Sequence, residues 1–196
     1  MRIISGQARG RKLFTPSRES NAIRPTSDRA REALFSILGE KLITARVLDL
    51  YAGTGALGIE ALSRGSRQVT FVDNNRKALD LIHKNCGICL QGLAMQEHKK
   101  AIIINHNLSR GLNFPDNTVL EDIPFDIVFL DPPYKKGLAS RSLIDLSNSD
   151  HLRSGTLVIA EEFSGEILAD SFGKLTLYDQ RRYGETGLWF YTSEMS

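Results

Sequence analysis

Several features are scarce in this sequence of 196 residues. Its two cysteines, Cys86 and Cys89, have neither the second pair nor the H-x-x-x-H partner that a zinc site would need. They fall on one apolar face of an expected helix, where free cysteine fills the core, so we predict no metal site. No apolar run approaches the roughly 20 residues that span a bilayer, and the first residues lack the features of a signal peptide. We therefore expect a cytoplasmic protein that makes no contact with a membrane.

The composition is otherwise typical of a globular protein, with 41% hydrophobic and 24% charged residues. The net charge of +2 is unevenly distributed, because residues 1–32 carry +5 and the remaining residues carry −3. Arginine supplies seven of the eight cations in that basic segment, and its planar fork can hold a phosphate through two hydrogen bonds. A basic segment joined to a globular domain favours nucleic acid as the partner. The expected nucleic-acid contacts are Arg2, Arg9, Arg11, Lys12, Arg24 and Arg29.

The pattern of apolar residues divides the chain into a basic arm and a main domain. Residues 1–25 contain two short, arginine-rich runs of strand character, which favour a small β-hairpin arm over a part of the core. After them, apolar positions recur at helical spacing as far as Leu38, with Arg29 and Arg31 off the apolar face. We therefore expect an arm over residues 1–25 and a main domain over residues 26–196.

Strands and helices are expected to alternate along the main domain. Apolar runs of strand length occur at residues 46–50, 69–72, 101–104, 125–130 and 156–160. Two further strands, at residues 174–178 and 188–192, are joined by a link so short that they must be antiparallel neighbours. The pattern predicts an α/β fold with an open, mostly parallel sheet of seven strands, helices on both faces and an antiparallel C-terminal hairpin.

Three glycines with G-x-G-x-x-G spacing, Gly53, Gly55 and Gly58, follow the first of these strands. Glycine allows a sharp turn and lets a ligand lie against bare main chain, so this turn is typical of a site for a nucleotide-like cofactor. Asp73 ends the next strand about 20 residues after the first glycine, where an acid that bonds ribose hydroxyls is expected. Asp49, just before the turn, suits a cationic cofactor such as S-adenosylmethionine better than a pyrophosphate.

The sequence Asp131-Pro132-Pro133-Tyr134 follows a nearly continuous apolar run, which is typical of a strand buried on both faces. In an open α/β sheet, ligands bind at the carboxyl ends of the strands. The two prolines lack N–H donors, so together with Asp131 they present hydrogen-bond acceptors beside an aromatic ring. This arrangement suits a planar base with an exocyclic amine, which would stack on Tyr134 with its nitrogen lone pair turned toward a methyl donor. These four residues are the catalytic candidates.

The glycine turn resembles motif I of the S-adenosylmethionine-dependent methyltransferases, and residues 131–134 resemble the (D/N)PP(Y/F) motif of amino-methyltransferases that act on nucleic-acid bases. More narrowly, the chain is similar to the RsmD family of bacterial 16S ribosomal RNA guanine-N2 methyltransferases. That resemblance covers nearly the whole chain and rests on residues 2–6 with 9–13, 24–32, 49–65 and 131–134. It implies a Rossmann-like methyltransferase sheet, S-adenosylmethionine as the cofactor, and methyl transfer to a guanine of 16S ribosomal RNA, either naked or within an assembling small subunit. A monomer is the default expectation.

The resemblance also implies roles for individual residues. Asp49, Gly53 and Gly55 would hold the methionine part of the cofactor, and Asp73 would bond the ribose where the family prefers glutamate. The acid often found near the adenine is replaced by Asn105 or Asn107, either of which can bond the adenine amine. The expected cofactor-binding residues are Asp49, Ala52, Gly53, Thr54, Gly55, Gly58, Asp73, Asn74 and Asn107.

Three other functions fit parts of the sequence. A DNA adenine-N6 or cytosine-N4 methyltransferase would share both motifs, but such an enzyme needs a sizeable target-recognition region, which this chain lacks. A non-catalytic RNA-binding or ribosome assembly factor would have no need to keep both motifs intact. A nicotinamide oxidoreductase would leave the Asp-Pro-Pro-Tyr sequence unexplained.

Overall fold

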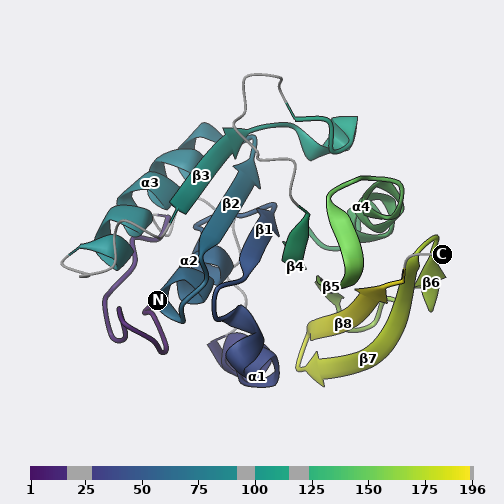
Figure 1. Ribbon diagram of the computed structural model, residues 1–196, viewed down its shortest axis with the longest axis horizontal. Coiled ribbons are helices and arrows are strands. Elements are labelled where there is room, and N and C mark those ends of the chain that lie inside the picture. The colour runs from purple at the N-terminus through teal and green to yellow at the C-terminus, as the bar shows by residue number, and fades with distance from the viewer. Residues whose placement is uncertain (17–27, 92–99, 115–123, 195–196) are drawn as a thin grey trace.

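The computed structural model describes residues 1–16, 28–91, 100–114 and 124–194. Within these ranges one sheet contains eight strands in the order β3-β2-β1-β4-β5-β8-β7-β6 (Figure 1). The strands are β1 (Arg46–Leu50), β2 (Gln68–Asp73), β3 (Lys100–Asn105), β4 (Phe125–Leu130), β5 (Leu152–Phe163), β6 (Ser171–Phe172), β7 (Leu175–Tyr183) and β8 (Thr186–Ser193).

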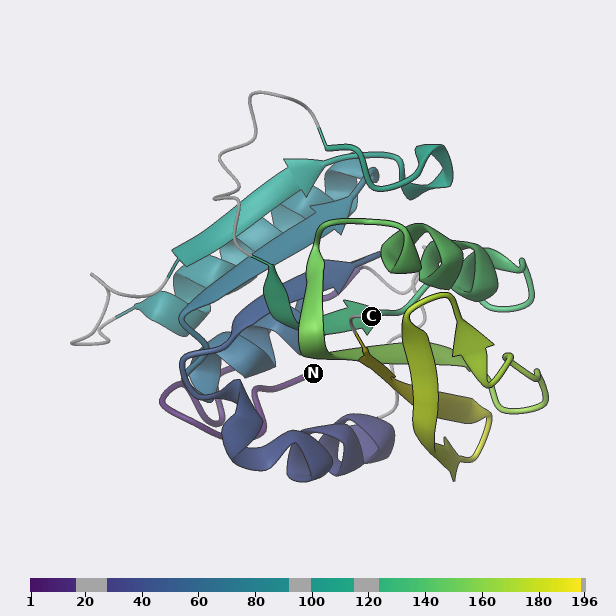
Figure 2. The same cartoon turned by 45° about the vertical axis from the view of Figure 1, so that its right-hand side comes forward.

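The strand pairing confirms an open, mostly parallel sheet with an antiparallel hairpin at its end. Strands β1 to β5 pair in parallel, and β8 and β7 continue the sheet as antiparallel strands beyond β5 (Figure 2). The described residues contain one strand more than the seven expected. The additional strand, β6, pairs only Ser171 and Phe172 with β7, and two residues are too few to produce a detectable alternation of apolar positions.

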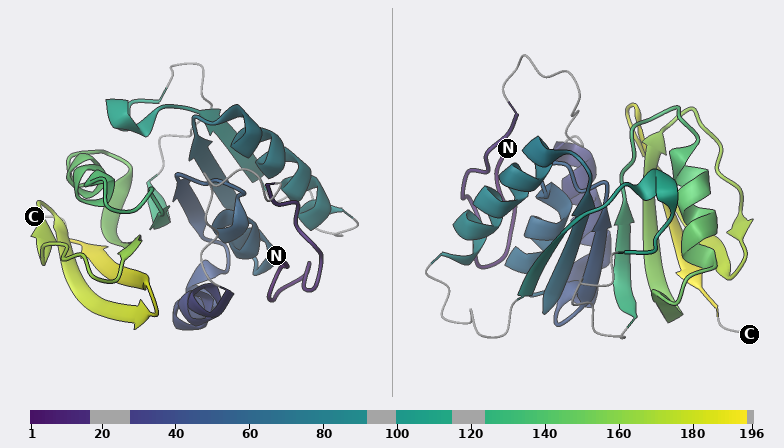
Figure 3. Two further views of the ribbon diagram at one scale, coloured as in Figure 1. Left: turned by 180° about the vertical axis from the view of Figure 1, so that it is seen from behind. Right: turned by 90° about the horizontal axis from the view of Figure 1, so that it is seen from above.

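Helices cover both faces of the sheet, as expected. Among the described residues the α-helices are α1 (Asp28–Leu38), α2 (Ala56–Ser63), α3 (Arg76–Leu90) and α4 (Leu138–Ser147), with short 3₁₀ turns η1 (Gly39–Leu42) and η3 (Leu108–Arg110). Figure 3 shows α2 and α3 on one face and α4 on the other, and each face has its own apolar core. Because both faces are covered, all five positions of β1 are buried.

The sequence also explains where individual helices begin. Asn75 is the N-cap of α3, and its side-chain oxygen accepts a hydrogen bond from the Lys77 N–H at 2.9 Å. Cys86 and Cys89 lie on this helix as buried thiols outside any disulfide, which confirms that they fill the core. No helix in the described ranges is long and apolar enough to cross a membrane.

The N-terminal segment, residues 1–14, differs from the expected arm because it packs against the main domain. Arg2 and Lys12 form an isolated antiparallel bridge, so the segment does turn back on itself. Ile3, Ala8 and Leu13 are only 2%, 1% and 7% exposed, however, and belong to the core beneath α1, α2 and α3. The expectation that this segment lies outside the core was therefore wrong.

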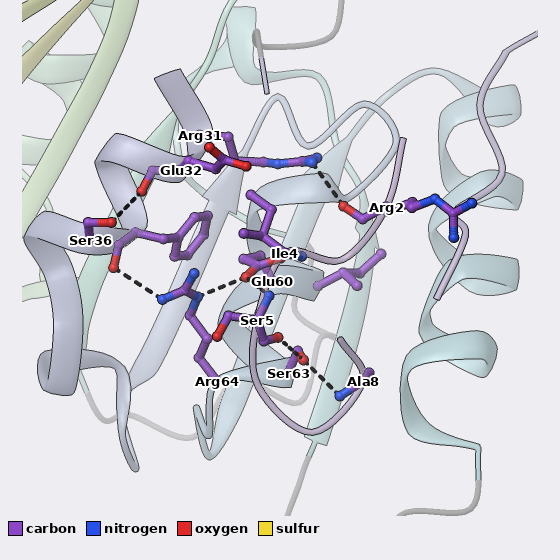
Figure 4. A network of polar contacts seen from close by, with 12 residues as sticks. Arg2, Ile4, Ser5, Ala8, Arg31, Glu32, Ser36, Glu60, Ser63 and Arg64 are labelled. Atoms are coloured by element: carbon purple, nitrogen blue, oxygen red, sulfur yellow. Dashed lines mark hydrogen bonds and ion pairs between the residues drawn. The ribbon is translucent and has the colours of Figure 1, made fainter. Parts of the chain in front are cut away.

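Polar contacts hold the N-terminal segment on helix α2 (Figure 4). The buried Glu60 carboxylate accepts hydrogen bonds from the backbone N–H groups of Ile4 and Ser5, at 2.7 and 2.9 Å, and from Arg64 Nε at 2.8 Å. Gly6 has a φ of +82°, and a Cβ there would lie 2.1 Å from the carbonyl oxygen of Ser63. Only glycine allows the segment to approach the helix so closely.

Arg31 is a second correction, because it was expected on the exposed side of α1. It is 2% exposed, and its Nη2 donates to the Arg2 carbonyl oxygen and to Asp28 Oδ1, both at 2.9 Å. The guanidinium thus joins α1 to the N-terminal segment (Figure 4). The predicted domain boundary at residue 25 lies outside the described residues.

Candidate functional site

The register of the central strands brings the two sequence motifs to the same edge of the sheet. Leu50 at the end of β1 pairs with Val72 on one side and with Leu130 on the other. The residues that follow, Asp73 after Val72 and Asp131 after Leu130, therefore lie on opposite sides of the glycine turn. The Asp131 N–H donates to the Leu50 carbonyl oxygen at 3.4 Å. This edge is formed by the carboxyl ends of parallel strands, where ligands bind in such sheets.

Asp49 is buried beneath the turn, with 1% of its surface exposed. Its Oδ2 accepts a hydrogen bond from the Gly58 N–H, in the first turn of α2, at 2.9 Å. The pKa of Asp49 is raised to about 8, chiefly by burial and to a lesser degree by the Asp73 carboxylate, while the hydrogen bond from Gly58 acts in the opposite direction. A buried carboxyl group that ionises with difficulty is suited to a cationic ligand, because a nearby positive charge would stabilise its charged form. The donor set therefore fits S-adenosylmethionine.

Asp73 connects two turns at the end of β2. One carboxylate oxygen accepts the Gly53 N–H at 2.9 Å, and the other accepts the Asn75 N–H at 2.8 Å. Gly53 and Gly55 have φ angles of 55° and 76°, which only glycine adopts readily. A carboxylate has about four acceptor positions, so Asp73 keeps acceptors for two ribose hydroxyls.

Gly58 has a packing role in addition to its bond to Asp49. A Cβ at this position would lie 2.3 Å from the Phe71 ring and 2.7 Å from Val69, so glycine lets α2 pack closely on β2. Thr54, in the same turn, is buried, whereas Ala52 is half-buried. The Thr54 carbonyl oxygen accepts a bond at 3.0 Å from the side chain of Asn85, a fully buried residue of α3.

Asn85 was missed in the sequence, where it looks like a polar position of an amphipathic helix. Its side chain also accepts the Phe14 N–H at 2.7 Å and donates to the Phe14 carbonyl oxygen at 3.0 Å. The residue thereby connects the N-terminal segment to the glycine turn. A fully buried asparagine with three such bonds fixes the position of both.

Two asparagines were expected near the adenine of the cofactor. The side-chain oxygen of Asn107 accepts the Ser109 N–H at 3.0 Å and caps η3. Asn105 lies directly opposite Asp73 in the β2–β3 ladder and is exposed. Asn74, next to Asp73, is exposed as well.

The Asp-Pro-Pro-Tyr residues follow β4 in a loop that contacts the ends of β5 and β8. Asp131 and Tyr134 are half-buried, Pro132 is buried and Pro133 is exposed. The Tyr134 hydroxyl donates to the Glu161 carboxylate of β5 and lies 3.3 Å from Thr186 Oγ1 of β8. Burial and the Glu161 charge raise the pKa of Tyr134. Glu161 directly follows the strand expected at residues 156–160, and its position at the carboxyl edge of the sheet was a signal that could have identified it.

The expected nucleic-acid contacts fall into two groups. Arg2 and Arg11 are engaged within the protein, since Arg2 Nη1 donates to the Gly10 carbonyl oxygen at 3.1 Å and Arg11 Nη1 donates to the Ile88 carbonyl oxygen at 2.6 Å. Arg11 also bonds the Gln91 carbonyl oxygen at 2.7 Å and so caps the end of α3. Arg2, Arg9, Lys12 and Arg29 are exposed, Arg11 is half-buried, and Arg24 lies outside the described residues.

The strand order, the glycine turn and the Asp-Pro-Pro-Tyr motif together place this chain in the class of Rossmann-like methyltransferases. A model of the family described as "Conserved hypothetical protein 95" matches residues 1–192. The chain is 33% identical to ribosomal RNA small subunit methyltransferase D of Escherichia coli K12, covering 99% of this chain and 90% of that protein. It is 37% identical to the protein of the same name from Haemophilus influenzae, over 82% of this chain and 78% of the relative.

A solved structure agrees with these matches. It is that of an Escherichia coli protein provisionally named the methyltransferase yhhF, which superimposes with a TM-score of 0.77 at 31% identity and covers 99% of this chain and 98% of that one. The chain therefore belongs to the RsmD family.

Proposed function

We propose that this protein transfers a methyl group from S-adenosylmethionine to the exocyclic N2 amine of a guanine in 16S ribosomal RNA. The relatives that are named ribosomal RNA small subunit methyltransferase D support an S-adenosylmethionine-dependent enzyme that acts on ribosomal RNA. The choice of guanine N2 rests on the chemistry of residues 131–134. An RNA substrate of this kind implies a cytoplasmic enzyme, for which a monomer is sufficient.

One observation carries the proposal. The Asp-Pro-Pro-Tyr loop follows β4, whose neighbour β1 leads into the glycine turn, and Leu50 pairs with Leu130 at this point. A methyl donor held by the turn and an amine held by the loop would therefore be adjacent. Well-oriented reactants gain roughly 7–11 kcal/mol over reactants in solution, which is the main source of rate available here.

The reaction forms a bond between the guanine nitrogen and the methyl carbon and breaks the bond between that carbon and the sulfonium sulfur. The amine is a poor nucleophile because its lone pair is delocalised into the ring. The Asp131 carboxylate and the Pro132 carbonyl oxygen accept the two amine hydrogens, while the ring stacks on Tyr134. The nitrogen becomes cationic as the new bond forms and then loses a proton to solvent, so no strong general base is required.

The cofactor roles are proposed from the donors and acceptors at the edge. When bound, S-adenosylmethionine would supply the methyl group. Asp49 would face its positive charges, Gly53 and Gly55 would present main chain to its methionine part, and Asp73 would accept bonds from its ribose. Asn105, level with Asp73 in the ladder, joins Asn107 as a candidate for the adenine amine, because the Asn107 oxygen already accepts the Ser109 N–H.

Exposed cations near the motif suit a phosphate backbone. Lys135 and Lys136 follow Tyr134 directly and are exposed. Arg182 of β7 is exposed and pairs with Gly187, next to Thr186. We assign RNA contacts to these residues together with Arg9, Lys12 and Arg29. Arg2 and Arg11 are left out of this set because their side chains bond carbonyl groups of the protein itself.

Transfer of a labelled methyl group to naked 16S RNA and to small-subunit particles tests the proposal. Asp131→Ala should lower the turnover number by about 10²-fold, because the contact strengthens as the nitrogen gains charge, whereas Asp131→Asn should keep part of the activity. Asp150→Ala, which removes an exposed carboxylate elsewhere, is the matched control. Wild-type turnover by Asp131→Ala, or no transfer by the wild type to either substrate, would refute the proposal.

A further inference from the structure

The Tyr134 side chain is attached at its far end to the neighbouring strands. Its hydroxyl donates to the Glu161 carboxylate and lies 3.3 Å from Thr186 Oγ1. Glu161 is 3% exposed and Thr186 is 7% exposed, so the hydroxyl reaches into the protein while the ring remains half-buried at the edge. The bond fixes the direction in which the ring lies.

A second carboxylate of β5 holds the backbone immediately after the ring. Glu162, 2% exposed, accepts the Lys135 N–H at 3.0 Å and the Phe163 N–H at 2.8 Å through the same oxygen, Oε1. Lys135 has a φ of 59°, in the left-handed region that is unfavourable for a residue with a side chain. The Lys135 ammonium lies 3.9 Å from the centre of the Phe163 ring. The loop is thus held in an unfavourable conformation by the end of β5.

Neither carboxylate is explained by stability alone. Burying a carboxylate is costly unless it is paired, and a well-packed apolar residue is commonly as stable. The two carboxylates bond different parts of the loop, since Glu161 accepts from the Tyr134 hydroxyl and Glu162 accepts from the Lys135 N–H. Stacking requires a ring plane held parallel to the base, and a misplacement of about 1 Å can cost a factor of 10² in rate.

We propose that Glu161 is a positioning residue for methyl transfer, which orients the Tyr134 ring for stacking on the target base through the bond to its hydroxyl, with Glu162 holding the adjoining backbone. This inference rests on the proposed function, because the ring is useful only if a base stacks on it. In this role Glu161 bonds the Tyr134 hydroxyl rather than the cofactor or the base. Its effect on the reaction passes through the Tyr134 hydroxyl.

A double-mutant cycle between Tyr134→Phe and Glu161→Leu tests the inference in two assays. In the methylation assay, Glu161→Leu should lower the turnover number about tenfold and raise the Michaelis constant for RNA, with cofactor affinity unchanged. Added to Tyr134→Phe, it should cause no further loss, because the hydroxyl through which it acts is already absent. Glu161→Gln retains an acceptor oxygen and should keep activity within about threefold of the wild type. Glu166→Leu, at an exposed position beyond β5, is the matched control.

Urea unfolding of the same four proteins measures the hydrogen bond independently of activity. The effects of Tyr134→Phe and Glu161→Leu on the unfolding equilibrium constant should be coupled by about fivefold. That coupling without RNA methylation by the wild type would mean that the proposed function had failed while the contact is real. A folded Glu161→Leu variant with wild-type kinetic constants, or additive losses in turnover, would overturn the positioning role. Should Glu161→Leu not fold, Tyr134→Phe and Glu161→Gln decide the question. A Tyr134→Phe variant with wild-type turnover would overturn the role.

Discussion

The proposed place of Asp49 in the cofactor site predicts that binding of S-adenosylmethionine depends on pH. The carboxyl group has a pKa of about 8 because it is buried. At pH 5.5 almost all of it is neutral, whereas the bound sulfonium and ammonium groups of S-adenosylmethionine favour the ionised form. At pH values below this pKa, the apparent affinity for S-adenosylmethionine should therefore rise nearly tenfold for each unit by which the pH increases. Between pH 5.5 and 7.0 the expected gain is about 30-fold, or about 2 kcal/mol.

Isothermal titration calorimetry measures both the affinity and the proton that is released. At pH 7.0, comparison of two buffers with different ionisation enthalpies should show about 0.9 proton released per cofactor bound. Two neighbours of Asp49 are also titratable, namely Asp73 and the Cys86 thiol. Asp49→Asn assigns the effect, since this variant should bind more weakly and lose most of the pH dependence. An affinity that does not change with pH, or the same dependence in Asp49→Asn, would refute the reasoning.

Four further predictions follow from the described contacts. Because the pKa of Asp49 in the folded protein lies above its ordinary value of 3.8, the folded state holds a proton that the unfolded state has lost. The free energy of unfolding of the cofactor-free protein should thus fall as pH rises from about 4 to 8, with a smaller slope in Asp49→Asn, and an equal slope in both would contradict this. Asp73→Ala should weaken binding of S-adenosylhomocysteine by roughly 1–3 kcal/mol, because the Gly53 and Asn75 N–H groups lose their acceptor; unchanged binding by calorimetry would count against the ribose assignment. Cys86 and Cys89 should react with a thiol reagent only on unfolding, since both are buried and burial raises the pKa of Cys86 to about 12; rapid labelling of the native protein would show that the packing is wrong. Replacing Arg9, Lys12 and Arg29 by alanine should weaken RNA binding and flatten its salt dependence by about one charge each. Arg11→Ala should instead chiefly lower thermal stability. Weaker RNA binding by Arg11→Ala, with unchanged binding by the other three variants, would contradict this assignment.

The sequence was sufficient where one local pattern determines a structure. Strands β1 and β4 are short apolar runs that end in a recognisable turn, so their bounds and the edge at which Asp49 and Asp131 lie could be predicted. Asp73 followed from its spacing after Gly53. These features depend on neighbours in the chain and on the rule that parallel strands present their carboxyl ends together.

Other features depend on contacts between distant segments. Ile3, Ala8 and Leu13 are spaced five residues apart among arginines, which matches neither a strand nor a helix, so their burial was not visible in the sequence. Arg31 is buried and bonds the carbonyl oxygen of Arg2, a residue 29 positions earlier in the chain. The joint contact of Tyr134 with Glu161 and Thr186 requires β5 to lie between β4 and β8, and the order of the strands along the chain does not give this arrangement.

The identity of the modified nucleoside tests the central claim most directly. RNA from small-subunit particles, incubated with the enzyme and S-adenosylmethionine carrying an isotopically labelled methyl group, is digested to nucleosides and analysed by mass spectrometry. The proposed reaction predicts that the label appears in N2-methylguanosine with the wild type and is strongly reduced with Asp131→Ala. Label in N6-methyladenosine or in a methylated cytidine, or no label in RNA at all, would contradict the proposed reaction.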